Sequence, residues 1–110
     1  MSVQHKELAS GRWARLSFVE QMANVGSEVS RALNWKKKGN VEYCQKAVYR
    51  AFELLSLTID NTAIASHYKE LTRLKEALVD YFFGTNQFSS TEVLWRKYFD
   101  HFNFAARRNF

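Results

Sequence analysis

The sequence predicts an all-α protein built as an antiparallel up-and-down bundle of four helices. Its 110 residues include no proline and only four glycines, and the stretches between the glycines are rich in Ala, Leu, Glu, Lys and Arg, which favour helices. Hydrophobic residues make up 46% of the chain, enough to bury a core, and they recur at the three- and four-residue spacing of a helix face. A chain of this length is expected to form a single domain over residues 1–110.

The first helix is expected over residues 13–38. Its apolar residues share one face, namely Phe18, Met22, Val25, Val29 and Ala32. Three lysines precede Gly39 at its end, the pattern of cations in a last turn followed by a left-handed cap residue.

The second helix is expected over residues 41–60 and the third over residues 64–84. Asn40 is suited to cap the second helix, and Glu42 lies in its first turn, where the helix dipole favours an anion. Asp60, Asn61 and Thr62 form a turn-prone cluster before the third helix.

The fourth helix is expected over residues 90–108. Ser89 followed by Glu92 has the spacing of a capping box, while Phe88 and Val93 occupy the positions of a hydrophobic staple. Because the connections between the helices are short, each helix should turn back on the one before it, which predicts the antiparallel order.

The charge of the chain favours acidic partners. Lys and Arg outnumber Asp and Glu by 16 to 11, a net charge of +5, which is attractive to RNA or DNA. An antiparallel bundle would gather these cations into two basic poles, so the candidate nucleic-acid-binding residues are Arg12, Arg15, Arg107 and Arg108 at one end and Lys36, Lys37 and Lys38 at the other. The alternative for the lysines is a solvated helix end.

Most enzyme classes lack support in the sequence. There is no Gly-rich phosphate loop, no nucleophile elbow and no His-Glu-x-x-His motif. His5, His67 and His101 show no metal-ligand spacing, so neither a metal nor a cofactor is expected. Cys44 is the only cysteine and no run is apolar enough for a membrane span, which predicts a cytoplasmic protein with no membrane contact.

One short pattern has a possible catalytic meaning: Arg96 is followed after four residues by His101. This spacing resembles the R-x4-6-H signature of the HEPN superfamily, small helical domains that usually dimerise. The resemblance implies a metal-independent ribonuclease in which His101 is the acid–base group, Arg96 steadies the scissile phosphate and Asp100 is a polar neighbour. It also implies a possible nucleotidyltransferase-like partner protein and a place in a toxin–antitoxin pair.

The residues of this motif also allow a structural interpretation. Positions five apart lie roughly 140° apart around a straight helix, so Arg96 and His101 would converge only in a distorted helix or across a dimer axis. In the alternative, Arg96 pairs with Asp100 one turn away and His101 lies at the surface.

The last predicted helix is apolar on more than one side, which indicates more than one packing partner. We therefore expect a homodimer whose interface includes Trp95, Tyr98, Phe99 and Phe102. Three functions follow as hypotheses: a dimeric HEPN-like bundle that binds a partner protein or RNA, a ribonuclease using His101 and Arg96, and an adaptor that binds a protein through its aromatic helix face.

Overall fold

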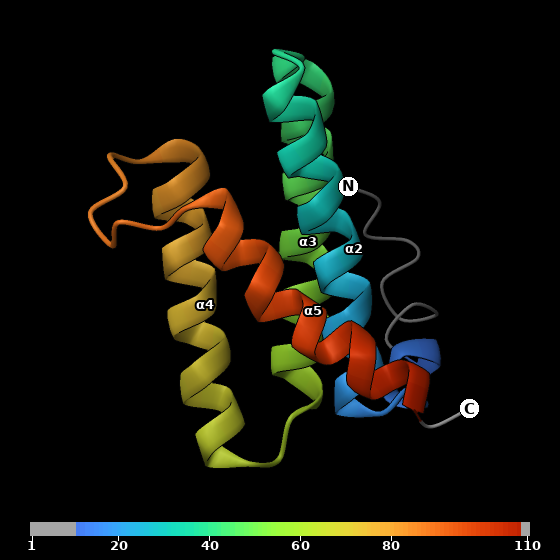
Figure 1. Ribbon diagram of the computed structural model, residues 1–110. Helices are drawn as coiled ribbons and strands as arrows, with labels where there is room; N and C mark the ends of the chain where they lie inside the picture. The colour runs from blue at the N-terminus through green and yellow to red at the C-terminus, as the bar shows by residue number, and fades with distance from the viewer. Residues whose placement is uncertain (1–10, 109–110) are drawn as a thin grey trace.

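The computed structural model describes residues 11–108. A helical turn at residues 11–14 precedes four long helices, and no strand occurs within this range. The helices are α2 (Phe18–Lys37), α3 (Val41–Asn61), α4 (Ala65–Phe83) and α5 (Glu92–Arg108) (Figure 1). The predicted all-α class is confirmed, and each of the four predicted ranges contains one long helix.

The helices differ in how closely they pack. Figure 1 shows α2 and α3 as an antiparallel hairpin, α4 beside α3, and α5 inclined to the hairpin. The most extensive contacts join α2 to α3 and α2 to α5, whereas α4 packs only lightly, against α3. Among the described residues α2 is therefore the central helix, and α4 and α5 leave space between them.

The start of α2 lies later than predicted because a capping box begins it. The Ser17 Oγ accepts a hydrogen bond from the Glu20 N–H at 3.1 Å, and the Glu20 carboxylate accepts one from the Ser17 N–H at 3.0 Å. This reciprocal pair satisfies backbone donors that a helix start leaves without partners. The expected start near Trp13 is wrong, since the residues around it form the separate turn at 11–14.

The joint between α2 and α3 is as predicted. Gly39 has a φ of +75°, in the left-handed region that favours glycine. The Asn40 Oδ1 accepts from the Tyr43 N–H at 3.0 Å and so caps α3.

The predicted capping box at the start of α5 is wrong. Ser89 has a φ of +54°, outside the extended conformation of an N-cap residue. The helix begins instead at Glu92, after Thr91, whose Oγ1 accepts from the Leu94 N–H at 3.1 Å. The predicted hydrophobic staple is also wrong, because both of its side chains are exposed, Phe88 at 61% and Val93 at 73%.

The core is formed by side chains from all four helices. Its fully buried members include Met22, Val25, Leu55, Leu71 and Leu78. The turn before α2 is tied to this core by the Trp13 indole N–H, which donates to the Thr58 Oγ1 at 2.9 Å. A buried polar pair of this kind orients the segment because each partner satisfies the other away from water.

Candidate functional site

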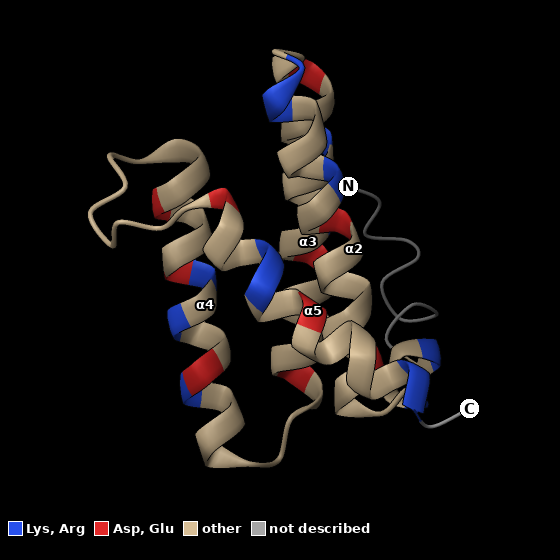
Figure 2. Cartoon of the chain, in the orientation of Figure 1, with Lys and Arg blue, Asp and Glu red and all other residues tan. Residues whose placement is uncertain are grey.

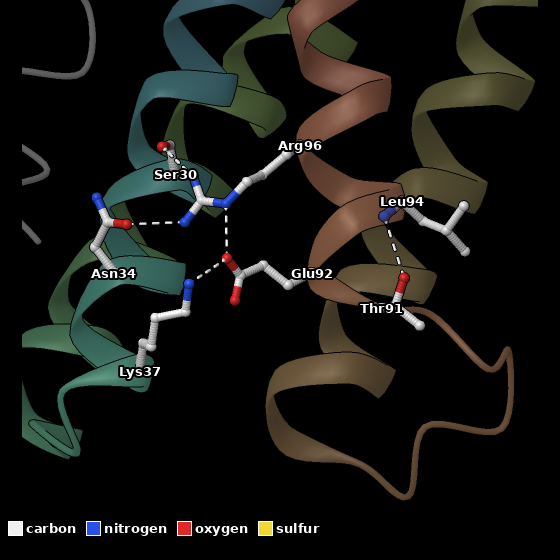
Figure 3. Close-up of polar contacts among 7 residues, drawn as sticks. All are labelled: Ser30, Asn34, Lys37, Thr91, Glu92, Leu94 and Arg96. Atoms are coloured by element: carbon white, nitrogen blue, oxygen red, sulfur yellow. Dashed lines mark hydrogen bonds and ion pairs between the residues drawn. The ribbon is translucent and has the colours of Figure 1, made fainter.

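The Arg96 side chain attaches α5 to α2 (Figure 3). Its Nε donates to the Glu92 carboxylate at 2.8 Å, and its two terminal nitrogens donate to the Ser30 Oγ at 3.0 Å and the Asn34 Oδ1 at 2.8 Å. Lys37 lies 3.1 Å from the same Glu92 carboxylate. These hydrogen bonds from Arg96 and Lys37 hold the pKa of the Glu92 carboxyl below its usual value.

Arg96 and His101 do not share a site within one chain. Arg96 lines a hollow of about 420 Å³ against α2, together with Asp100 and Asn103. His101 lines a different hollow, of about 470 Å³. The regular helix places the two side chains on different faces, and the predicted i, i+4 partner of Arg96 proves to be Glu92, one turn before it, and not Asp100.

His67 lines the same hollow as His101. No pattern in the sequence predicts that these two residues lie close together. The lining of this hollow comes from the starts of α2 and α4 and from α5, namely Phe18, Ser66, His67, Glu70, Tyr98, His101 and Phe102. The His67 ring stacks on Phe18 with the ring centroids 4.0 Å apart. Two imidazoles, whose ring nitrogens can donate or accept hydrogen bonds, therefore line one hollow.

The basic residues differ in how freely their charges are exposed. Lys36 lies 4.0 Å from the Tyr81 ring centroid, Lys37 pairs with Glu92, and Lys38 lies 5.1 Å from the Trp35 ring centroid. Each of these lysines therefore has a local partner that competes with a nucleic-acid phosphate.

The other predicted basic pole is more open. Its members Arg12, Arg15, Arg107 and Arg108 are all exposed. Phe18 and Phe102, with ring centroids 6.1 Å apart, bring the start of α2 against the last third of α5, and Figure 2 shows basic segments at both places. This basic pole adjoins the hollow that holds both histidines, because Phe18 and Phe102 line that hollow.

A groove of about 540 Å³ separates α4 from α5. Its α4 wall is formed by residues at helical spacing, Glu70, Arg73, Leu74 and Ala77, and its α5 side by Ser90, Leu94, Trp95, Lys97 and Tyr98. The volume falls within the range of roughly 300–1,000 Å³ of binding pockets. The floor is apolar, while charged side chains stand at the rim.

Two polar atoms of residues that line this groove have no hydrogen-bond partner among the described residues. They are the Trp95 Nε1 and the Tyr98 Oη, both buried. Burial, reinforced by the negative charge of Glu70, raises the pKa of the Tyr98 hydroxyl, which therefore stays protonated and able to donate. An unpaired buried donor costs about 1–3 kcal/mol, so these two atoms lower the stability of the fold around the groove.

The predicted interface residues are used differently from one another. Trp95, Phe99 and Phe102 are buried in the core of the chain itself, and Tyr98 is half-buried. The apolar side chain of α5 that remains available at the groove is Leu94, which is 55% exposed. The sequence pattern that could have identified Leu94 is its position next to the buried residues of α5, on a helix that is apolar on more than one side.

Two searches of the described residues give negative results. Between residues 11 and 108, no group of three or more His, Cys, Asp or Glu side chains is placed to hold a metal ion. No helix in that part of the chain is long and apolar enough to cross a membrane. His5, one of the three histidines considered in the sequence, lies outside the described residues.

Comparison with protein-family models, with curated proteins and with solved structures finds no match to this chain.

Proposed function

We propose that this chain is a HEPN-like helical module that works through protein–protein association, as a homodimer joined at the groove between α4 and α5. The observation that carries the proposal is the groove itself, which presents apolar side chains at helical spacing on two helices. Such a surface is suited to receive an apolar face of another chain. The resemblance at Arg96 and His101 adds the expectation of a partner protein of the nucleotidyltransferase type.

The proposal includes an up-and-down antiparallel arrangement of the helices with an inclined last helix. In this arrangement α5 packs against α2 and not against α4, so the groove between α4 and α5 stays open. The cytoplasm is the proposed location, because the single cysteine suits a reducing compartment.

Replacement of Leu94 tests the role of the groove. Leu94→Glu places a charge on the apolar floor, so we expect the dimer to dissociate to monomers in sedimentation equilibrium, with Kd raised by roughly 100-fold, equivalent to about 3 kcal/mol. The matched control is Val93→Glu, since Val93 is the neighbouring residue, is more exposed and does not line the groove. A wild-type protein that remains monomeric at millimolar concentration would overturn the proposal.

A second candidate function is the binding and metal-independent cleavage of RNA. The observation that favours it is the hollow with His67 and His101 next to the open basic pole. In this version His67 takes the place that the HEPN resemblance assigned to Arg96, because Arg96 is occupied by Glu92, Ser30 and Asn34.

Paired variants separate RNA binding from cleavage. We expect Arg107→Ala with Arg108→Ala to weaken the binding of a single-stranded RNA and to lower its salt dependence, because two phosphate contacts are lost. His101→Ala should stop cleavage while leaving binding intact. RNA left whole by the wild-type dimer would exclude the catalytic part, and binding unaffected by the arginine pair would exclude the basic pole.

A further inference from the structure

The loop at residues 84–91, between α4 and α5, is held by one carboxylate. The Asp80 Oδ1 accepts from the Gln87 N–H at 2.9 Å, and its Oδ2 accepts from the Phe88 N–H at 3.1 Å. The Asp80 carbonyl oxygen accepts from the N–H groups of Gly84 at 3.0 Å and Asn86 at 3.2 Å. The end of α4 thus fixes the course of the loop.

A second set of bonds fixes the other half of the loop. The Asn86 side chain exchanges hydrogen bonds with the backbone of Ser90, each at 2.9 Å. Asn86 and Ser89 both have a positive φ, +57° and +54°. Asn tolerates this left-handed conformation, whereas Ser adopts it only rarely, so the surroundings hold Ser89 there.

This fixed loop displays an aromatic ring that the chain itself does not bury. Phe88 is 61% exposed, although its own N–H is bound by Asp80. An exposed phenyl ring on a preorganised loop loses little conformational freedom when it binds, which makes it a favourable anchor. Ser90, two residues later, lines the groove, so this anchor and the groove are neighbours.

We propose that a second copy of this chain fills the groove, with Phe88 of each protomer inserted into the groove of the other. This inference rests on the proposed function and specifies its geometry. A two-fold interface uses the same surface of both protomers, and the loop that displays Phe88 meets the groove at Ser90. Along α5 the groove runs from Leu94 to Tyr98, four residues or about 6 Å, and Ser90 lines it just before the helix begins.

In a symmetric dimer of this kind, the loop of each protomer lies against the groove of the other. The charges at the rim are of both signs, Glu70 against Arg73 and Lys97. The symmetric arrangement allows each carboxylate to face a cation of the other copy, which offsets repulsion between two basic chains.

Mixing of complementary variants tests this geometry. In sedimentation equilibrium we expect Phe88→Ala to weaken dimerisation by roughly 100-fold, because two anchor rings are lost per dimer, and Leu94→Glu to weaken it similarly. An equimolar mixture should dimerise more strongly than either variant alone, because one intact Phe88 then meets one intact groove. The control is Gln87→Ala, exposed and adjacent to Phe88, which should dimerise as the wild type does.

The outcomes separate this inference from the proposed function. If Phe88→Ala dimerises as tightly as the wild type while Leu94→Glu does not, the exchange of Phe88 is overturned and the groove interface survives. A mixture no more dimeric than its components overturns the exchange as well. A monomeric wild type overturns both. Circular dichroism of each variant, with an unchanged helical signal and unfolding midpoint at monomer concentrations, shows that lost association is not lost folding.

Discussion

At the scale of single residues, Gly26 shows how closely α5 approaches α2. A methyl group added at Gly26 would lie 2.8 Å from the Phe99 Cβ and 2.9 Å from its Cδ1. Gly26 is buried in the middle of α2, where a glycine lowers helix stability by about 1 kcal/mol relative to alanine. Because Gly26 has no side chain, Phe99 packs directly against the backbone of α2. This packing offsets the lower helix propensity of glycine.

Replacement of Gly26 should reveal this contact. We expect Gly26→Ala to lower the free energy of unfolding by about 1–3 kcal/mol, because the clash with the Phe99 ring outweighs the gain in helix propensity. Urea denaturation followed by circular dichroism measures it. The matched control is Ser27→Ala, at the neighbouring exposed position of the same helix, which should be neutral or slightly stabilising. A stabilising Gly26→Ala would mean that α5 can move aside at no cost.

Arg96 is the residue whose role changed most between sequence and structure. Its spacing from His101 resembled a catalytic motif, whereas its guanidinium bonds Glu92, Ser30 and Asn34. The planar guanidinium suits this task because its donors point in several fixed directions at once. A short motif gives residue types and spacing, but neighbours from a distant helix decide which of its groups remain free.

At the scale of secondary-structure elements, the helix starts depend on backbone conformation as much as on residue type. Ser17 with Glu20 and Ser89 with Glu92 have the same spacing, yet only the first pair forms a capping box. The second is prevented because the loop bonded to Asp80 holds Ser89 at a positive φ. Thr91 caps α5 in its place.

Two substitutions at the start of α5 should have opposite effects. Thr91→Ala removes the hydroxyl that accepts from the Leu94 N–H, and we expect it to lower the free energy of unfolding by about 1 kcal/mol. Ser89→Gly should be neutral or stabilising, because glycine adopts a positive φ without strain. Thermal and urea unfolding of both variants measure the difference. A greater loss with Ser89→Gly than with Thr91→Ala would restore Ser89 as the cap.

At the scale of the whole molecule, stability should be unevenly distributed. The central helix α2 packs extensively against α3 and α5, whereas α4 packs lightly on α3 and buries only Leu71, Leu74 and Leu78. Segments with fewer buried contacts open locally at a lower free energy than the core. The helix that forms one wall of the groove is therefore also the one least supported by its own chain.

Hydrogen exchange should follow this distribution. In dilute protein we expect the amides of α4 to exchange faster than those in the middle of α2 and α3, because local opening of α4 exposes less apolar surface. At high concentration, the proposed dimer should increase the protection of α4 and of residues 84–91, while α2 changes little. Mass spectrometry of exchanged peptides at both concentrations provides the measurement. Equal protection of α2 and α4 in the monomer would contradict this description.

The sequence by itself determined the all-α class, the four helices and the Gly39–Asn40 joint, because these depend on local periodicity and on the conformational preferences of neighbouring residues. Its error at the start of α2 lay at the local capping box of Ser17 and Glu20, and its error at the cap of α5 arose where hydrogen bonds to Asp80 set the backbone of the loop.

Only the tertiary structure decided where each apolar residue of α5 lies, with Trp95 and Phe99 in the core and Leu94 at the groove. It also separated Arg96 from His101 and brought His67 beside His101. The physical reason is that these relations depend on the angle at which α5 meets α2. That angle follows from the close approach of Phe99 to Gly26, a contact between residues too far apart in the chain for any local pattern to encode.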